Sequence, residues 1–227
     1  MYYLIFRGTS ALVETFILVI AALFPVVNPP GSALVFLSLT QRASMKARRS
    51  LALRVAINSF FVMLGSLLLG TLVLNIYGIS VPIIRVAGGI VVAVSGWKLL
   101  NEGNKKEAGD AGEIEDSDFR NIAFYPLTLP LTTGPGTIAV MISLGFGRTR
   151  QPTAVEELIY VVAILLGTFV VAAAVYVCFA YASRVERILG RTGTDVAVRL
   201  SAFILLCIGV QILWNGISEL LSAVIRQ

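Results

Sequence analysis

Residues 25–39 of the chain read PVVNPPGSALVFLSL, and residues 130–144 read PLTTGPGTIAVMISL. The second segment follows the first at a constant offset of 105 residues. The identical pairs in this register are Pro25 with Pro130, Pro30 with Pro135, Gly31 with Gly136, Val35 with Val140, Ser38 with Ser143 and Leu39 with Leu144. Apolar residues match easily in a hydrophobic chain, whereas two prolines and a glycine in register do not. We therefore interpret the two segments as copies within an internal repeat.

The composition is that of a membrane protein. The chain has 227 residues, a mean hydropathy of +0.86 and only 14% charged residues, against about 25% in soluble domains. The charges cluster between apolar runs, which favours membrane topology over binding to nucleic acid. The apolar runs cover residues 11–40, 51–76, 79–100, 121–147, 156–182 and 197–222. Because about 20 apolar residues cross a bilayer core of about 30 Å, we expect an all-α membrane protein with six transmembrane spans.

Lysine and arginine residues set the expected orientation, because cytoplasmic loops carry an excess of both. Thirteen of them lie in residues 41–54, 98–120 and 183–199, and four lie on the opposite side. We expect these three segments to be cytoplasmic loops of a multi-pass protein in the cell (plasma or inner) membrane, with both termini outside. No cleavage site of small residues follows the first run, so we expect that run to be an uncleaved span.

The repeat has a topological consequence. Arg85-Val86-Ala87 and Arg199-Leu200-Ser201 extend it at an offset of 114 residues, so each copy has three spans. Three is an odd number, so the second copy should be inverted in the membrane, as in many secondary transporters. We expect a single membrane domain in which a first three-span repeat at 1–100 and a second at 121–227 are joined by an acidic cytoplasmic linker at 101–120.

Both repeat segments should interrupt the spans that contain them. Proline removes a backbone donor and clashes with the preceding turn, and the residue before it resists helical angles. The first and fourth spans should therefore be broken at the midplane, within residues 25–31 and 130–136. Exposed backbone is tolerated there only against protein or a water-filled cavity. A simple proline kink is the alternative for one such span, but two matching breaks favour a site for a substrate or an ion.

Each break should place the carbonyl end of one helix opposite the amide end of the next. The carbonyl end favours an ammonium group or a cation, and the amide end favours a carboxylate. A small zwitterionic substrate satisfies both ends, and the coupling ion would be H⁺ or Na⁺. The candidate substrate-binding residues are Asn28, Pro29, Pro30, Gly31, Ser32, Thr132, Thr133, Gly134, Pro135, Gly136 and Thr137.

Two ionisable residues inside predicted spans are candidates for coupling or gating. Arg85 lies in the third span, where it is either functional or an anchor that snorkels to the interface. Glu14 lies near the outer end of the first span. It is an interfacial acid, a partner of Arg7 or Arg85, or a proton carrier.

The residue types indicate no other chemistry. The chain has no histidine, and Cys178 and Cys207 lie far apart within apolar runs. We therefore expect no metal site, no disulfide and no cofactor. No nucleophile stands beside a base in an arrangement suited to covalent catalysis, so we expect that the protein is not an enzyme.

Four segments resemble the MarC family of membrane proteins. They are NPPGSALVFLSLT (28–40), RVAGGIVVAVSGWKLL (85–100), NIAFYPLTLPLTTGPGTIAVMISL (121–144) and RLSAFILLCIGVQILWNGI (199–217). The resemblance places the family's two motifs on residues 28–31 and 133–137. It implies six spans and, through SnatA-like members of the family, transport of small neutral amino acids such as glycine, alanine and serine.

Two other functions remain open. The protein is alternatively an exporter of another small metabolite or drug. It is otherwise a non-transporting membrane protein that senses stress or acts as a scaffold, with residues 101–120 as its interaction surface. Deletion of 101–120 should leave transport intact in a transporter and should abolish function in a scaffold.

The predicted orientation is testable by cysteine accessibility. Single cysteines placed within 101–120, after the replacements Cys178→Ala and Cys207→Ala, should resist a membrane-impermeant thiol reagent added to intact cells. They should react once the cells are opened, because the loop is expected to be cytoplasmic. Rapid labelling in intact cells would contradict the topology.

Overall fold

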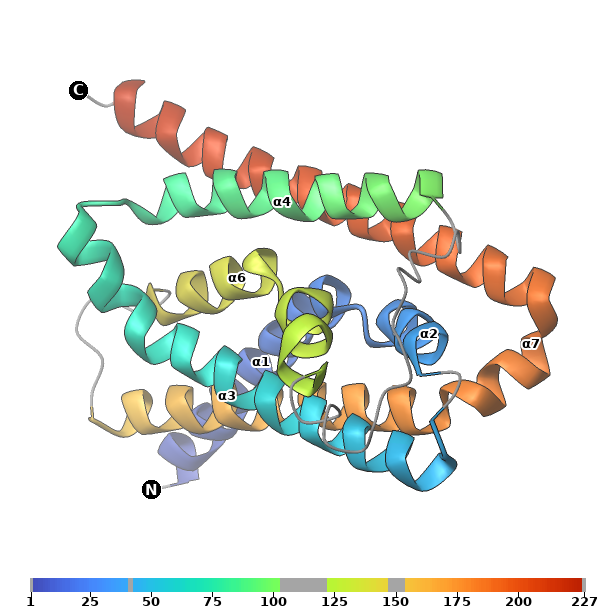
Figure 1. Ribbon diagram of the computed structural model, residues 1–227. Helices are drawn as coiled ribbons and strands as arrows, with labels where there is room; N and C mark the ends of the chain where they lie inside the picture. Colours follow the sequence, from blue (N-terminus) through green and yellow to red (C-terminus); the bar gives the residue numbers. More distant parts are fainter. Residues whose placement is uncertain (1, 41–42, 103–121, 147–153, 226–227) are drawn as a thin grey trace.

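The structure, a computed structural model, describes residues 2–40, 43–102, 122–146 and 154–225 (Figure 1). Every element in this part of the chain is a helix. Its elements are α1 (Tyr2–Val27), α2 (Pro29–Leu39), α3 (Met45–Tyr77), α4 (Val81–Glu102), η1 (Ala123–Thr132), α6 (Pro135–Phe146) and α7 (Ala154–Ile225). Almost all of the expected linker at 101–120 lies outside the described residues.

Five helices in the described part of the chain are long and apolar enough to cross a membrane. They cover Ser10–Leu37, Met45–Gly70, Val81–Asn101, Ala154–Arg184 and Asp195–Ile225, and Pro135–Gly145 is a shorter apolar helix. The prediction of an all-α membrane protein is therefore confirmed. A sixth span requires η1 and α6 to be counted together, and it stays a prediction.

Two of the predicted cytoplasmic loops are more helical than expected. α3 already begins at Met45, because Ser44 Oγ accepts a hydrogen bond from Ala47 N at 3.2 Å and caps the helix. Residues 183–199 contain a break between two helices of α7, but the break is confined to Gly190, whose φ of 65° suits glycine. The candidate spans Ala154–Arg184 and Asp195–Ile225 lie on either side of it.

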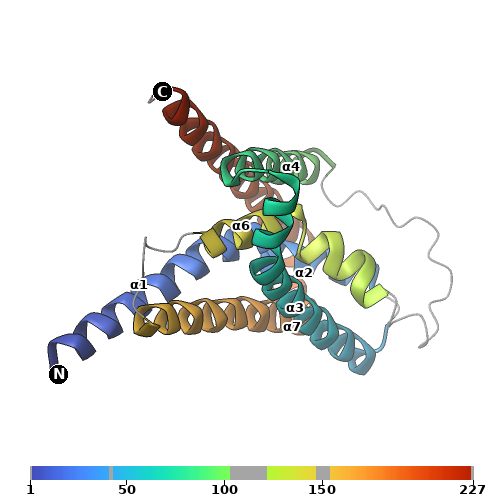
Figure 2. The same cartoon turned by 90° about the vertical axis from the view of Figure 1, so that its left-hand side faces the viewer.

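The turn at Gly190 gives α7 two arms (Figures 1 and 2). The first arm packs antiparallel to α3. The contacts along this seam are Arg48 with Ser183, Arg49 with Tyr181 and Phe60 with Phe169. As the residue numbers rise along α3 they fall along α7, so the two helices run in opposite directions.

The second arm of α7 packs antiparallel to α4, and both helices lie together at the top of Figure 1. Glycines allow the two backbones to approach closely. A Cβ at Gly89 would lie 2.4 Å from the backbone nitrogen of Leu213, and a Cβ at Gly209 would lie 2.3 Å from that of Ala93. No side chain fits at either position without separating the helices.

The two short helices α2 and α6 each pack on a helix from the other half of the chain. Phe36 of α2 stacks on Phe179 of α7, with ring centroids 4.5 Å apart. Ile142 of α6 lies against Gly70 of α3, where a Cβ would be 2.3 Å from Ile142 Cγ1. The core therefore joins residues from both halves of the chain.

Gly89→Ala tests the seam between α4 and α7. The added methyl group meets backbone atoms, so we expect a loss of about 1–3 kcal/mol in the free energy of unfolding, measured by thermal unfolding in detergent. Gly65→Ala is the matched control, because a Cβ there meets nothing within 4 Å. It should leave stability unchanged or raise it slightly. Equal effects of the two substitutions would contradict close packing at Gly89.

Candidate functional site

The chain leaves the helical conformation at Asn28. α1 ends at Val27 and α2 begins at Pro29, and Asn28 has left-handed angles (φ 47°, ψ 59°), which asparagine tolerates better than most residues. Its Oδ1 accepts a hydrogen bond from Gly31 N at 3.3 Å and caps α2. A Cβ at Gly31 would lie 2.4 Å from Asn28 Nδ2, so this cap requires glycine at position 31.

Prolines deprive the end of α1 of donors. In a continuous helix the carbonyls of Pro25 and Val26 would accept from the N–H groups of residues 29 and 30, but both of these residues are prolines. The following carbonyl, that of Val27, accepts a hydrogen bond from Ser32 Oγ at 3.2 Å. The end of α1 therefore presents acceptors where α2 begins.

The second proline-rich segment forms η1, a π-helical stretch that is wider than an α-helix. Tyr125 and Leu129 each precede a proline and have non-helical angles. The hydroxyls of Thr128 and Thr132 donate to carbonyls five residues earlier, each at 2.7 Å. These side-chain donors occupy carbonyls in a segment whose prolines supply none.

Thr133 joins η1 to α6, with φ −118° and ψ 71°. Its backbone nitrogen donates to Thr128 O at 2.8 Å. Its side chain is 0% exposed, and Oγ1 has no hydrogen-bond partner among the described residues. A buried hydroxyl without a partner is unfavourable, and a bound polar molecule would satisfy it.

The two segments meet, although they are far apart in the sequence. Ser32 Oγ, which contacts Val27 O, also lies 3.4 Å from the carbonyl oxygen of Leu131. At Gly136 in the first turn of α6, a Cβ would lie 1.9 Å from Val92 Cγ2 and 3.5 Å from Val26 Cγ1. The end of α1 and the start of α6 are thus in contact, and α4 covers them.

Most of the predicted binding residues are hidden from the surface. Ser32, Thr132, Thr133 and Thr137 are at most 7% exposed. Pro29, Gly31 and Gly136 are also buried, Asn28 and Gly134 are partly buried, and Pro30 and Pro135 are exposed. The hydroxyl-bearing residues of the set therefore form a buried polar cluster.

The two candidates for coupling or gating lie elsewhere. Arg85 forms an ion pair with Glu219 of α7 at 2.5 Å, and its Nε lies 3.4 Å from Ser143 Oγ of α6. Glu14 is exposed on α1. The carboxylate partner of Arg85 is therefore Glu219, and not Glu14 as one alternative had it.

Two side chains were missed by reasoning from the sequence. Glu219 falls inside the predicted sixth span, and an acid inside a span is itself a sign of function. Arg48 counted only as a loop charge, yet it is 8% exposed. It donates to Thr40 O at 2.7 Å and to Ser183 Oγ. A cation there complements the C-terminal end of α2, and no sequence pattern indicated its burial.

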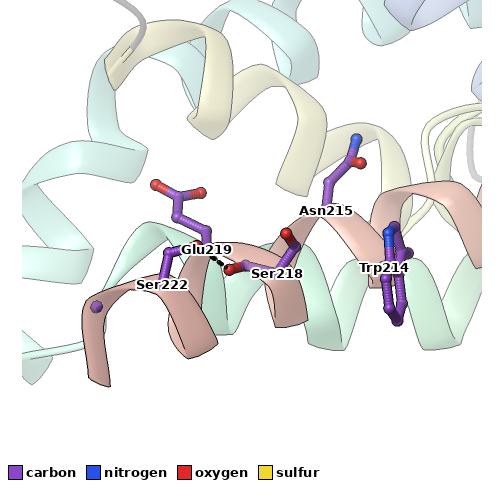
Figure 3. A pocket seen from close by; sticks show the side chains of 6 residues that line it. Trp214, Asn215, Ser218, Glu219 and Ser222 are labelled. Carbon is purple, nitrogen blue, oxygen red and sulfur yellow. Dashed lines mark hydrogen bonds between the residues drawn. The ribbon is translucent and has the colours of Figure 1, made fainter. Parts of the chain in front are cut away.

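A hollow opens beside the ion pair of Arg85 with Glu219 (Figure 3). It is lined by Trp214, Asn215, Ser218, Glu219, Ser222 and Ala223 of α7. Asn215 and Glu219 extend from α7 to the same side (Figure 3). None of the predicted binding residues lines this hollow.

The chain is similar to known membrane proteins over most of its length. The family described as "MarC family integral membrane protein" matches residues 13–221. The inner membrane protein MarC of Escherichia coli strain K12 is 34% identical over 208 residues, which cover 89% of this chain and 94% of that protein. The MarC proteins of Shigella flexneri and of Escherichia coli O1:K1 give the same identity and coverage. No solved structure matches the chain significantly.

Asn28→Ala tests the conformation at the first turn. Alanine is strained at the left-handed backbone angles of this position and has no side-chain oxygen to cap α2. We therefore expect a loss of about 1–2 kcal/mol in the free energy of unfolding. Asn28→Gly removes the same cap, but glycine adopts left-handed angles freely. We therefore expect this variant to lose only about 0.3 kcal/mol in stability. Thermal unfolding in detergent measures both variants. An equal loss in the two would show that the backbone angle is unimportant.

Proposed function

The chain belongs to the MarC family of integral membrane proteins, and we propose that it is a secondary transporter of small neutral amino acids. Glycine, alanine and serine would bind between α1, α2, η1 and α6 and would reach each side of the inner membrane in turn. The observation that carries this proposal is the meeting of two proline-rich turns around a buried polar cluster. One hydroxyl of that cluster, Thr133 Oγ1, has no hydrogen-bond partner among the described residues.

The proposal includes six spans arranged as two inverted repeats, with the first and fourth spans broken at the midplane. Packing supports it. α2 of the first repeat packs on α7, and α6 of the second repeat packs on α3. Equivalent helices of the two repeats, α4 and the second arm of α7, lie antiparallel. A pseudo-two-fold axis in the membrane plane would produce both features.

The backbone at the two turns suits a zwitterion. The carbonyls of Pro25 and Val26, which lack their usual helical donors, would accept from the substrate's ammonium group. The N–H groups of Gly136 and Thr137 lie in the first turn of α6, where a helix has free amides, and would bind the carboxylate. Asn28 and Thr133 would add side-chain contacts. The tight packing around Gly31 and Gly136, where even a Cβ would clash, would favour a small substrate over a bulky one.

The coupling ion in this proposal is H⁺ or Na⁺. The candidate binding residues include no acid and no histidine, so the site has no side chain that would carry a proton at neutral pH. Coupling to a cation would therefore use backbone carbonyls and not an acidic side chain. The two gradients are therefore separate conditions of the transport assay.

The test is uptake of radiolabelled glycine and alanine into proteoliposomes, with a proton gradient, a sodium gradient or neither. Wild type should show saturable uptake. Thr133→Val removes the unpaired hydroxyl at nearly constant volume, and we expect it to lower uptake about tenfold, since an unmade buried hydrogen bond costs about 1–3 kcal/mol.

Thr168→Val is the matched control. Thr168 of α7 is also buried and its Oγ1 also lacks a partner among the described residues, but it is not part of either turn. This variant should transport like wild type. If the wild-type protein takes up neither amino acid under any gradient, the assignment of small neutral amino acids as substrates is wrong. An exporter of another metabolite, or a scaffold acting through 101–120, would then be the better account.

A further inference from the structure

A polar stripe runs along the second arm of α7. Gln211, Asn215 and Glu219 are spaced four residues apart, so they share one face of the helix, and all three are exposed. Gln211 Nε2 donates to Asn215 Oδ1 at 2.9 Å. Gln211 stands near the middle of the apolar helix Asp195–Ile225. The stripe therefore extends from the centre of a membrane-spanning helix toward its C-terminal end.

Lipid is a poor environment for this face. Polar and ionisable side chains inside membrane spans are costly when they face hydrocarbon, and they normally face the protein interior or a water-filled cavity. In contact with lipid, the two amides and the carboxylate of this stripe would each add to the free-energy cost of inserting the helix. The face of α7 that bears them should accordingly be in contact with water.

The hollow beside the stripe provides the place for that water. Asn215 and Glu219 both line it, and both extend from α7 toward the pale yellow ribbon of α6 (Figure 3). At its edge, Arg85 joins Glu219 of α7 and contacts Ser143 of α6. The hollow thus lies along one face of the second arm of α7, and the Arg85–Glu219 pair links that face to α4 and α6.

α6 connects this hollow to the buried polar cluster. α4 runs antiparallel to α6, and their contacts are Arg85 with Ser143, Gly88 with Ala139 and Val92 with Gly136. Ser143 and Gly136 are seven residues apart on α6, which corresponds to roughly 10 Å along a helix. The Arg85–Glu219 pair therefore stands about two helical turns from the start of α6.

We infer that the hollow along the second arm of α7 is a water-filled entry vestibule in which Arg85 and Glu219 receive a zwitterionic amino acid. The guanidinium of Arg85 binds the carboxylate, and the carboxylate of Glu219 binds the ammonium group, so the substrate replaces the ion pair with two charge-assisted contacts. The side chains of Arg85 and Glu219 are 32% and 49% exposed, so an incoming molecule reaches both. The identity of the vestibule's ligand rests on the proposed transport function.

Cysteine labelling tests the water-filled vestibule without reference to transport. Gln211→Cys and Asn215→Cys, each in a chain carrying Cys178→Ala and Cys207→Ala, are treated in membranes with a charged, membrane-impermeant thiol reagent. Val210→Cys is the matched control, because Val210 neighbours Gln211, is 53% exposed and points to another face of α7. Both stripe positions should react at least about tenfold faster than position 210, because the thiolate that reacts forms in water and not in lipid.

Equal labelling rates at 210, 211 and 215 would overturn the vestibule. Slow labelling of Asn215→Cys, together with a disulfide between two copies of the chain, would overturn it in favour of a subunit interface. If uptake of alanine is intact and the stripe is unreactive, the vestibule fails while the proposed function stands. If the stripe is reactive and no amino acid is taken up, the proposed substrate fails and the water-filled vestibule stands.

Protection by substrate tests the role of the ion pair. Alanine in excess should slow labelling of Asn215→Cys severalfold, and this protection should disappear when Arg85→Gln is added. Glu219→Gln should weaken the protection as well, whereas lactate, which lacks the ammonium group, should protect poorly. Undiminished protection in both the Arg85→Gln and the Glu219→Gln variants would show that this ion pair does not recognise the zwitterion.

Discussion

The structure depends on one constraint, which is that a polypeptide surrounded by apolar material must satisfy its own backbone hydrogen bonds. Prolines at positions 29 and 30, and again in η1, remove donors where they are needed. The chain compensates locally with Asn28, Ser32 and the threonine hydroxyls of η1. The two turns, which come from opposite halves of the chain, meet in one place.

The rest of the fold holds that place closed. α2 and α6 each pack on a long helix of the opposite half, so neither half of the chain could bury its short helix alone. Glycine seams let α4 and α7 approach within backbone contact, and α4 in turn covers Gly136. At the C-terminal end of α2, Arg48 donates a hydrogen bond to the carbonyl oxygen of Thr40. The polar cluster is therefore enclosed by packing between the halves.

Much of this arrangement could be predicted from the sequence, because proline and glycine have strong local effects on a backbone. The helical class and the membrane location follow from hydropathy, and the candidate site follows from two matching proline-rich segments. Helix ends were harder, since the arginines at 183–199 indicate a boundary while the backbone stays helical except at Gly190. The π-helical form of η1 and the pairing of Arg85 with Glu219 depend on tertiary packing, which no local pattern encodes.

The single turn at Gly190 has a mechanical consequence. Within α7, Gly190 is the residue with non-helical backbone angles. The arm of α7 before it packs on α3, and the arm after it packs on α4. Each arm is a regular helix and moves as a rigid body. One arm can therefore tilt relative to the other only if the torsion angles at Gly190 change, and glycine has no side chain to oppose that change. Relative displacement of the groups seated on its two arms would thus be concentrated in a pair of dihedral angles.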